Sequence, residues 1–238
     1  MTRLSSALAI ALAVTLAALA AADAAPPASV KASYDVFKDG LHVAVAQETF
    51  EKNGAKYHIV SESNPAGLLA LFIRTRIKVL SSGAVTPAGL RPELFEYGRL
   101  DDASKNVSAT FDWQTQQLRM PFEGRNETAP ISMGAQDRLS VMYQFMFLPL
   151  DKLRDLAFQM TSNGKKIENY HYQLAGNEQL DTPLGKLNTL HLVKQREPGE
   201  NGTEIWLAPE RNFFPVKLLI LENDGSKFEQ VITQLEIQ

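Results

Sequence analysis

The chain has 238 residues, no cysteine and a formal net charge of −3 at pH 7. The absence of cysteine excludes disulfides, thiolate metal sites and thiol catalysis, so a hydrophobic core must stabilise the fold. The mild acidity, without a basic block to offset it, argues against nucleic acid or an anionic membrane as a partner.

The first 24 residues have the three parts of a secretory signal peptide. Arg3 supplies the positive charge, residues 7–19 form an apolar run, and Ala22-Asp23-Ala24 is a cleavage site of small residues. The apolar run is shorter than the roughly 20 residues that span a bilayer, so cleavage is favoured over a retained membrane anchor. We therefore predict an exported chain that has no transmembrane anchor after signal cleavage.

Alternating apolar residues predict β-strands through the first half of the mature chain. Turns at Lys38-Asp39-Gly40 and Lys52-Asn53-Gly54 join the first three strands into a meander. Residues 67–80 predict a further strand with one apolar and one basic face, although residues 68–72 could also form a short helical turn. The Gly- and Pro-rich residues 81–92 predict a loop.

The apolar period changes between Asp137 and Leu148. Apolar side chains recur there at helical spacing, the remaining positions are mostly apolar as well, and Asp137 is a suitable N-cap. A helix that is apolar nearly all round must be buried. A sheet that wraps around this helix would bury it.

The second half of the chain again predicts strands, with its clearest pattern in residues 180–216. That stretch contains a turn at residues 181–185, two strands joined by a loop at residues 197–202, and a break at Ala208-Pro209. About a dozen strands at roughly 8–12-residue spacing are typical of an all-β barrel or sandwich.

These patterns predict one architecture for the mature chain. Residues 25–30 form a flexible leader, and residues 31–238 form a single, mainly β domain. The fold class is an antiparallel β-barrel or a strongly curved open sheet with one buried helix at about residues 137–148.

Signatures of catalysis are missing from the sequence. It has no nucleophile elbow, phosphate-binding Gly-rich loop or His-Glu-x-x-His motif, and its four histidines stand singly in strand patterns. We therefore predict no catalytic residue, no metal site and no cofactor. Two acidic positions leave an enzymatic alternative open. Glu204 beside Trp206 could line a sugar site, and Asp137-Arg138 is more simply a helix cap with a surface partner.

The sequence has more large apolar residues than one helix and a sheet obviously require. The simpler interpretation is a closed core plugged by the helix. The functional interpretation is an apolar cavity or groove, which flexible methionines would let adapt to an acyl chain. The candidate lining consists of Leu68, Leu71, Phe72, Met142, Phe145, Met146 and Trp206.

Several motifs resemble a known family. The Asp-Thr-Pro-Leu-Gly turn from Asp181, the run Glu204-Ile205-Trp206-Leu207-Ala208-Pro209 and the helix start Asp137-Arg138-Leu139-Ser140 are similar to those of DUF3108, a family of secreted Gram-negative proteins of unknown function. The resemblance implies a mostly β fold in the periplasm. It implies no reaction and no functional residues.

Three hypotheses follow. The first is a non-enzymatic periplasmic protein that maintains the envelope by binding an apolar ligand, such as a lipid or a lipoprotein acyl chain, or a partner protein. The second is a closed scaffold whose sheet edges or basic strand face, at Arg74, Arg76 and Lys78, bind an envelope partner. The third is a hydrolase of glycans or peptides that uses Glu204 or Asp137. The oligomeric state is open.

Overall fold

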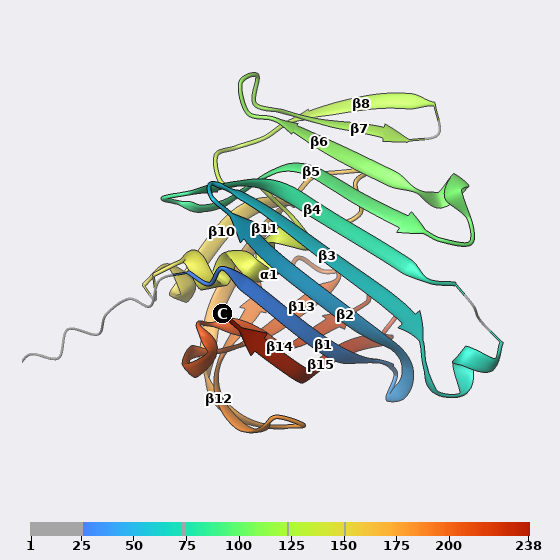
Figure 1. Ribbon diagram of the computed structural model, residues 1–238, viewed down its shortest axis with the longest axis vertical. Helices are drawn as coiled ribbons and strands as arrows, with labels where there is room; N and C mark the ends of the chain where they lie inside the picture. Colours follow the sequence, from blue (N-terminus) through green and yellow to red (C-terminus); the bar gives the residue numbers. More distant parts are fainter. Residues whose placement is uncertain (1–25, 73–74, 123, 150) are drawn as a thin grey trace, which may run out of the picture.

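A computed structural model describes residues 26–72, 75–122, 124–149 and 151–238, so the predicted signal peptide lies outside the described residues. Within these ranges the strands form one sheet (Figure 1), in which every neighbouring pair is antiparallel except β9 and β10. The strands are β1 (Ser29–Lys38), β2 (Leu41–Asn53), β3 (Lys56–Pro65), β4 (Ile77–Thr86), β5 (Gly89–Arg99), β6 (Val107–Asp112), β7 (Gln117–Phe122), β8 (Arg125–Pro130), β9 (Gln136–Asp137), β10 (Asp155–Thr161), β11 (Glu168–Thr182), β12 (Gly185–Lys194), β13 (Gly202–Ala208), β14 (Phe214–Leu221) and β15 (Lys227–Ile237). The helices are α1 (Ser140–Gln144) and the short 3₁₀ turns η1 (Gly67–Leu71), η2 (Ala103–Lys105), η3 (Phe145–Phe147), η4 (Lys152–Arg154) and η5 (Pro209–Arg211).

The strand order shows how the two halves of the chain share the sheet. It runs from β8 back to β1, then from β15 back to β9, so the first and last strands pair at the centre. The predicted meander of the first three strands is confirmed, because β2 pairs with both β1 and β3.

The sheet curls until its β9 end faces β4 and β5, but no strand pairing closes it. Side chains cross this seam instead. The Ser81 hydroxyl donates to the Asp137 carboxylate at 2.6 Å, and the Gln136 amide donates to the Leu90 carbonyl at 2.9 Å. Of the two predicted architectures, the strongly curved open sheet is the one observed.

The predicted buried helix is confirmed, and it packs inside the curve of the sheet. Tyr143 is completely buried and stacks on Phe50, with ring centroids 5.3 Å apart. Phe145, at the end of α1, is also completely buried and packs with Leu207 in a second apolar cluster. The helix therefore joins side chains from both halves of the sheet into the core.

The helix is shorter than predicted. Asp137 belongs to β9, α1 begins at Ser140, and the chain tightens into η3 from Phe145. The Asp137 carboxylate nevertheless accepts the backbone N–H groups of Leu139 and Ser140, at 2.9 and 2.8 Å, as a capping side chain does. Apolar periodicity alone could not distinguish this short helix from the strand and 3₁₀ turn on either side.

Of the two alternatives for residues 68–72, the short helical turn is observed as η1, and the predicted strand begins only at Ile77, where β4 starts. The predicted loop at residues 81–92 was wrong, because these residues form the hairpin of β4 and β5. Small residues are required there because the strands approach closely. A β-carbon at Gly83 would lie 2.2 Å from the Arg91 carbonyl oxygen. Glycine in this stretch therefore marks a tight hairpin, which the sequence pattern did not distinguish from a loop.

The predicted pattern of residues 180–216 is confirmed. β11 and β12 meet at the turn with Thr182 opposite Gly185, and η5 follows the break after Ala208. None of the helices in the described ranges has the length and hydrophobicity that a membrane span requires.

Candidate functional site

The curve of the sheet encloses a cavity of about 370 Å³, which we call the inner cavity. Strands β2–β4 contribute one part of its wall, and β10, β11 and β13–β15 contribute another. Leu139 and Met142 cover it from the helix side. Small-molecule sites have volumes of roughly 300–1,000 Å³, so the inner cavity is large enough for a ligand. Its apolar lining consists of Val79, Leu139, Met142, Met160, Leu218 and Ile220, with Tyr170 and Tyr172 beside them.

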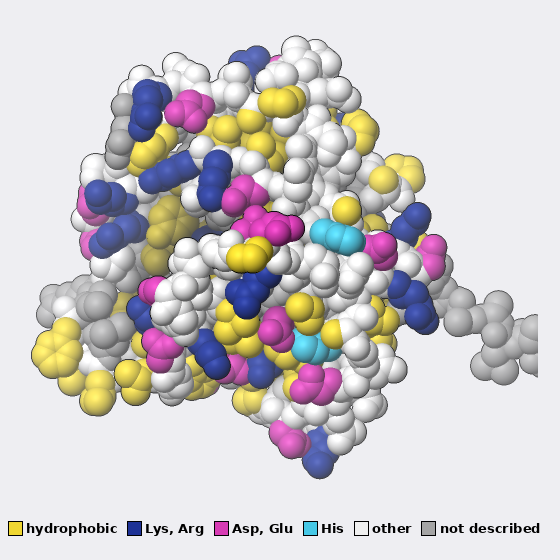
Figure 2. Space-filling view, turned by 180° about the vertical axis from the view of Figure 1, so that it is seen from behind, with side chains coloured by type: hydrophobic (Ala, Val, Ile, Leu, Met, Phe, Trp, Pro, Cys, Tyr) yellow, Lys and Arg dark blue, Asp and Glu magenta, His cyan; other side chains and the backbone are white. Residues whose placement is uncertain are grey.

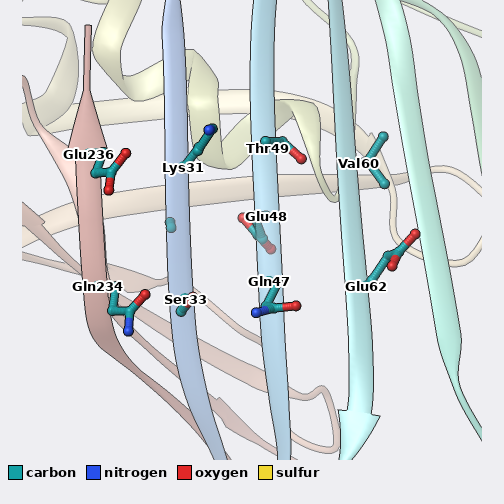
Figure 3. Close-up of a pocket in the computed structure, with 10 residues that line it drawn as sticks. Lys31, Ser33, Gln47, Glu48, Thr49, Val60, Glu62, Gln234 and Glu236 are labelled. Atoms are coloured by element: carbon teal, nitrogen blue, oxygen red, sulfur yellow. The ribbon is translucent and has the colours of Figure 1, made fainter.

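Glu48 is an acidic side chain on the inner face of β2. It alternates with the buried Ala46 and Phe50, whereas Gln47 and Thr49 point outward. Figure 3 shows Glu48 on the opposite side of the β2 ribbon from Gln47 and Thr49. A carboxylate in this position faces the inner cavity and the helix.

Hydrogen bonds hold Glu48 in place. The hydroxyls of Ser61 and Tyr143 each donate to its carboxylate at 3.1 Å. Burial raises the pKa of Glu48, and these hydrogen bonds together with the charge of Arg138 partly oppose that rise. Burial thus favours the protonated form of Glu48, which would reduce the negative charge in the cavity.

Arg138 follows β9 and lies at the cavity wall beside Leu139. Its guanidinium lies 5.2 Å from the centre of the Tyr97 ring, a cation–π distance. The protein around Arg138 partly desolvates its guanidinium, and this lowers the pKa of Arg138. The side chain is half-buried, because it borders the cavities. The expected surface partner was wrong, since no carboxylate of the described ranges forms an ion pair with Arg138.

A second cavity, also of about 370 Å³, adjoins the inner cavity, and we call it the basic mouth. Arg138 and Asn163 line both cavities, so they mark the place where the two meet. The other lining residues of the basic mouth are Tyr97, Arg99, Lys105, Val107 and Lys165. Figure 2 shows Lys and Arg side chains around a hollow in which hydrophobic side chains are visible.

The outer face of the sheet carries a larger depression of about 450 Å³ across β15, β1, β2 and β3 (Figure 3). Its walls are mostly polar and charged side chains, including Lys31, Gln47, Glu62 and Glu236. Such side chains are well solvated on an open face. The inner cavity is the better ligand site because it lies within the curve of the sheet and combines an apolar wall with polar and charged groups, among them Glu48, Arg138 and Glu222.

The predicted apolar lining divides between different parts of the structure. Met142 lines the inner cavity. Phe145 and Met146 are buried in the two core clusters. Trp206 is also buried, and it stacks on His191 across β12 and β13.

The remaining three predicted residues lie far out on the surface. Leu68, Leu71 and Phe72, in and just after η1, are 81%, 75% and 82% exposed. The structure therefore brings them together with one another but not with Met142. Their apolar run forms an exposed tip, which we call the η1 tip, and not a cavity wall.

The surroundings of Asp137 indicate a role in stabilising the fold. Its carboxylate is completely buried and accepts hydrogen bonds from Ser81, Leu139 and Ser140. Burial raises its pKa, and these hydrogen bonds oppose the rise. A carboxylate saturated by internal donors has little capacity left to act on a substrate.

A polar cluster that the sequence analysis missed surrounds Trp206. The His191 ring stacks on Trp206 at 4.3 Å between centroids, and its Nε2 lies 2.8 Å from Glu204. The Trp206 indole N–H donates to Glu178 at 2.7 Å. The β12–β13 register places His191 opposite Trp206, so pairing the two predicted strands could have found this contact. Over the described ranges, no group of three or more His, Asp or Glu side chains is arranged to hold a metal.

The comparisons with known proteins agree with the architecture. A family model described as "Protein of unknown function (DUF3108)" matches residues 31–233. A beta-barrel-like DUF1849 protein from Brucella abortus has 9% sequence identity and a TM-score of 0.56, with 89% of this chain and 98% of that chain covered. This likeness shows the fold alone.

Two more distant structures complete the comparison. A protein with a YmcC-like fold from Bacteroides fragilis, provisionally described as exported, has 12% identity and a TM-score of 0.38, with 88% and 96% of the two chains covered. A provisional lipoprotein from Parabacteroides distasonis has 8% identity and a TM-score of 0.35, with 88% and 95% covered. No curated protein matches the chain.

Proposed function

Because the chain belongs to the DUF3108 family of proteins of unknown function, we propose its function from the geometry of its own cavity. The protein is a non-enzymatic component of the cell envelope, and it holds an apolar ligand such as an acyl chain in the inner cavity. The observation that carries this proposal is the enclosed apolar wall around Met142, Met160 and Ile220. Two of these residues are methionines, whose flexible side chains can adapt to ligands of different shape.

We propose that the protein acts in the periplasm. Its first 24 residues support this location, because they have the charged, apolar and small-residue parts of a signal peptide. The N-terminal sequence of protein recovered from a periplasmic extract tests it. A mature chain that begins at Ala25 is expected, whereas retention of Arg3 in the purified protein would contradict cleavage.

The ligand proposal is tested with a neutral fluorescent probe, 1-N-phenylnaphthylamine, added to the purified full chain. The probe should gain fluorescence and saturate at one site. Ile220→Trp, which fills the cavity from β14, should abolish the gain. The matched control is Leu221→Trp, the next residue of the same strand, which points the other way. Equal binding by both variants would show that the probe binds outside the inner cavity.

A second candidate function is docking to an envelope partner protein. The η1 tip favours it, because Leu68, Leu71 and Phe72 together expose more apolar surface than isolated surface residues usually do. The predicted basic strand face has less support. Arg74 lies outside the described residues, and Lys78 already forms an ion pair with Glu62 at 2.9 Å.

Crosslinking in cells separates this candidate from the ligand-binding proposal. A partner captured by the natural chain and lost after combined Leu68→Ser, Leu71→Ser and Phe72→Ser substitution would support docking. Leu41→Ser is the matched control, because Leu41 is also exposed, at 71%, but lies in the β1–β2 hairpin. Identical crosslinking by all the variants would remove the docking candidate.

A further inference from the structure

One charged residue, Arg138, sits where the two cavities meet. It lines both the inner cavity and the basic mouth, so its guanidinium lies between an apolar wall and a group of cations. The Arg138 side chain is only partly exposed, and it borders both cavities. Its guanidinium can therefore contact a molecule that occupies either cavity.

Asp137 and Glu48 act on Arg138 electrostatically, but neither carboxylate forms an ion pair with its guanidinium. Within the described ranges its guanidinium makes no ion pair, and its one ring contact is with Tyr97 at 5.2 Å. Glu48 interacts with it electrostatically but directs its oxygens to Ser61 and Tyr143. The five N–H donors of a guanidinium match a carboxylate or a phosphate well, and here they remain available to a ligand.

The basic mouth strengthens the attraction for an anion. Its lining contains Arg99, Lys105, Lys165 and Arg138 and no carboxylate, although Arg99 is paired with Asp101 at 3.1 Å just outside. Lys165 lies over the Phe122 ring, 3.4 Å from its centre, and has no ion pair among the described residues. Cations that surround a partly enclosed site concentrate anions there.

The lining of the inner cavity determines the chemistry of the part of the ligand that lies away from Arg138. Beyond Arg138 an apolar wall continues through Leu139, Met142 and Met160. Glu48 and Glu222 also line the cavity, and Arg138 is the one cation among the described residues that line it. A small inorganic anion would leave this apolar space unfilled, and a neutral hydrocarbon would leave Arg138 without a partner. A molecule with an anionic head and an apolar tail satisfies both regions.

We propose that the inner cavity takes a single-chain amphiphile whose carboxylate or phosphate head pairs with Arg138 and whose acyl tail lies along Met142 and Met160. This proposal rests on the ligand-binding function proposed above and specifies the class of its ligand. Arg138 is the residue that selects the charged head. The basic mouth is the route by which the head reaches the solvent.

Competition against 1-N-phenylnaphthylamine tests the proposal with the full chain. Palmitate and 1-palmitoyl lysophosphatidic acid should each displace the probe at concentrations at least about 10-fold lower than hexadecanol, since one charge-assisted hydrogen bond gives about that ratio. Inorganic phosphate alone should not displace it. The relative strength of the two amphiphiles distinguishes a carboxylate source from a phosphate source.

Substitution of Arg138 provides the decisive comparison. Arg138→Met should reduce the preference for palmitate over hexadecanol to about 2-fold or less while probe binding is kept, and Arg138→Lys should restore part of the preference. Arg119→Met is the control, because Arg119 is exposed on β7 and pairs with Asp112. It should leave the preference unchanged.

The possible failures are distinguishable. If the natural chain does not bind the neutral probe, the proposed ligand-binding function fails. If it binds the probe but shows equal affinity for palmitate and hexadecanol, or if Arg138→Met keeps the preference, only the assignment of the anionic head is overturned. Displacement by inorganic phosphate would also overturn it, because the tail would then be unnecessary.

Discussion

Asp137 and Arg138 are neighbours in the chain, but their surroundings differ completely. Asp137 is completely buried, and its carboxylate accepts three hydrogen bonds at 2.6–2.9 Å from Ser81, Leu139 and Ser140. Arg138 is partly exposed, and its guanidinium lies near the Tyr97 ring, forms no ion pair among the described residues and borders two cavities. One charged group is saturated by the protein, and the other is not.

The difference separates a structural charge from one that is available to a ligand. Hydrogen bonds to Asp137 tie β4 to the start of α1 and so hold the open seam of the curved sheet. Arg138 contributes nothing comparable, because the described residues give its guanidinium no acceptor. Substitutions at the two positions should therefore affect different properties, namely stability for Asp137 and ligand selection for Arg138.

The largest expected effect is that of Asp137→Ala. This variant leaves the buried N–H groups of Leu139 and Ser140 without an acceptor, so the free energy of unfolding should fall by roughly 3–5 kcal/mol. Urea unfolding followed by circular dichroism measures it. Asp181→Ala is the control, because Asp181 is 85% exposed and should change stability by no more than about 0.5 kcal/mol. Equal losses in the two variants would end the distinction between Asp137 and an ordinary surface carboxylate.

A smaller loss is expected from Ser81→Ala. It removes one donor to Asp137 and the hydroxyl that lies 3.1 Å from Tyr57, while the two backbone donors remain. The free energy of unfolding should therefore fall by about 1–2 kcal/mol. In the Asp137→Ala background, Ser81→Ala should lower the free energy of unfolding by less, because the carboxylate that accepts from Ser81 is absent there. A double-mutant cycle measures this coupling. Strict additivity would mean that the two side chains do not act together across the seam.

The sequence predicted the architecture because it depends on short-range patterns. The turns at Lys38-Asp39-Gly40 and residues 181–185 fix neighbouring strands, and the apolar periods place the helix in the interior. The cavity depends instead on how distant strands curl toward each other. Arg138 and Asn163 line the same cavities although 24 positions separate them in the chain, and no local pattern carries that information.

The candidate site was harder to predict because hydrophobicity does not specify location. Leu68, Leu71 and Phe72 have the composition of a cavity wall, yet they lie on the exposed η1 tip. Ile220 and Leu218 line the cavity, yet their sequence pattern predicts only a β-strand. The inward position of Glu48 was not predicted, although the spacing of Ala46, Glu48 and Phe50 places all three on one face of β2.

The inward position of Glu48 predicts that stability depends on pH. Burial is the main cause that raises the pKa of Glu48 above its value in the unfolded chain, which is about 4.3. The folded state therefore binds this proton more tightly. Glu48 stabilises the fold below pH ~4.3, and the contribution is lost as the pH rises through the raised pKa. Glu48→Gln removes the titration, so the natural chain should lose stability relative to the variant over that window.

Urea midpoints of both proteins between about pH 4 and 7.5 measure the effect. Asp137 also has a raised pKa, but it is present in both proteins and cancels in the difference. Combining Glu48→Gln with Arg138→Met sharpens the comparison. Since the charge of Arg138 lowers the pKa of Glu48, the window should move to higher pH when Arg138 alone is replaced. Parallel curves for all proteins would mean that Glu48 is solvated like a surface residue.

The smallest effect on stability is expected from Arg138→Met itself. Met keeps much of the apolar stem of the arginine and removes a charge that burial disfavours, as the lowered pKa of Arg138 indicates. Replacement of a buried charge by an apolar side chain of similar volume is often neutral or stabilising, so the free energy of unfolding should change by less than about 1 kcal/mol. Urea unfolding of the ligand-free protein measures it.

A loss of stability as large as that of Asp137→Ala would show that Arg138 has an internal acceptor, and its selection of an anionic ligand would then lose its physical basis. A stable variant that no longer distinguishes palmitate from hexadecanol would instead separate the two neighbours by role, because Asp137 would hold the seam and Arg138 would bind the ligand.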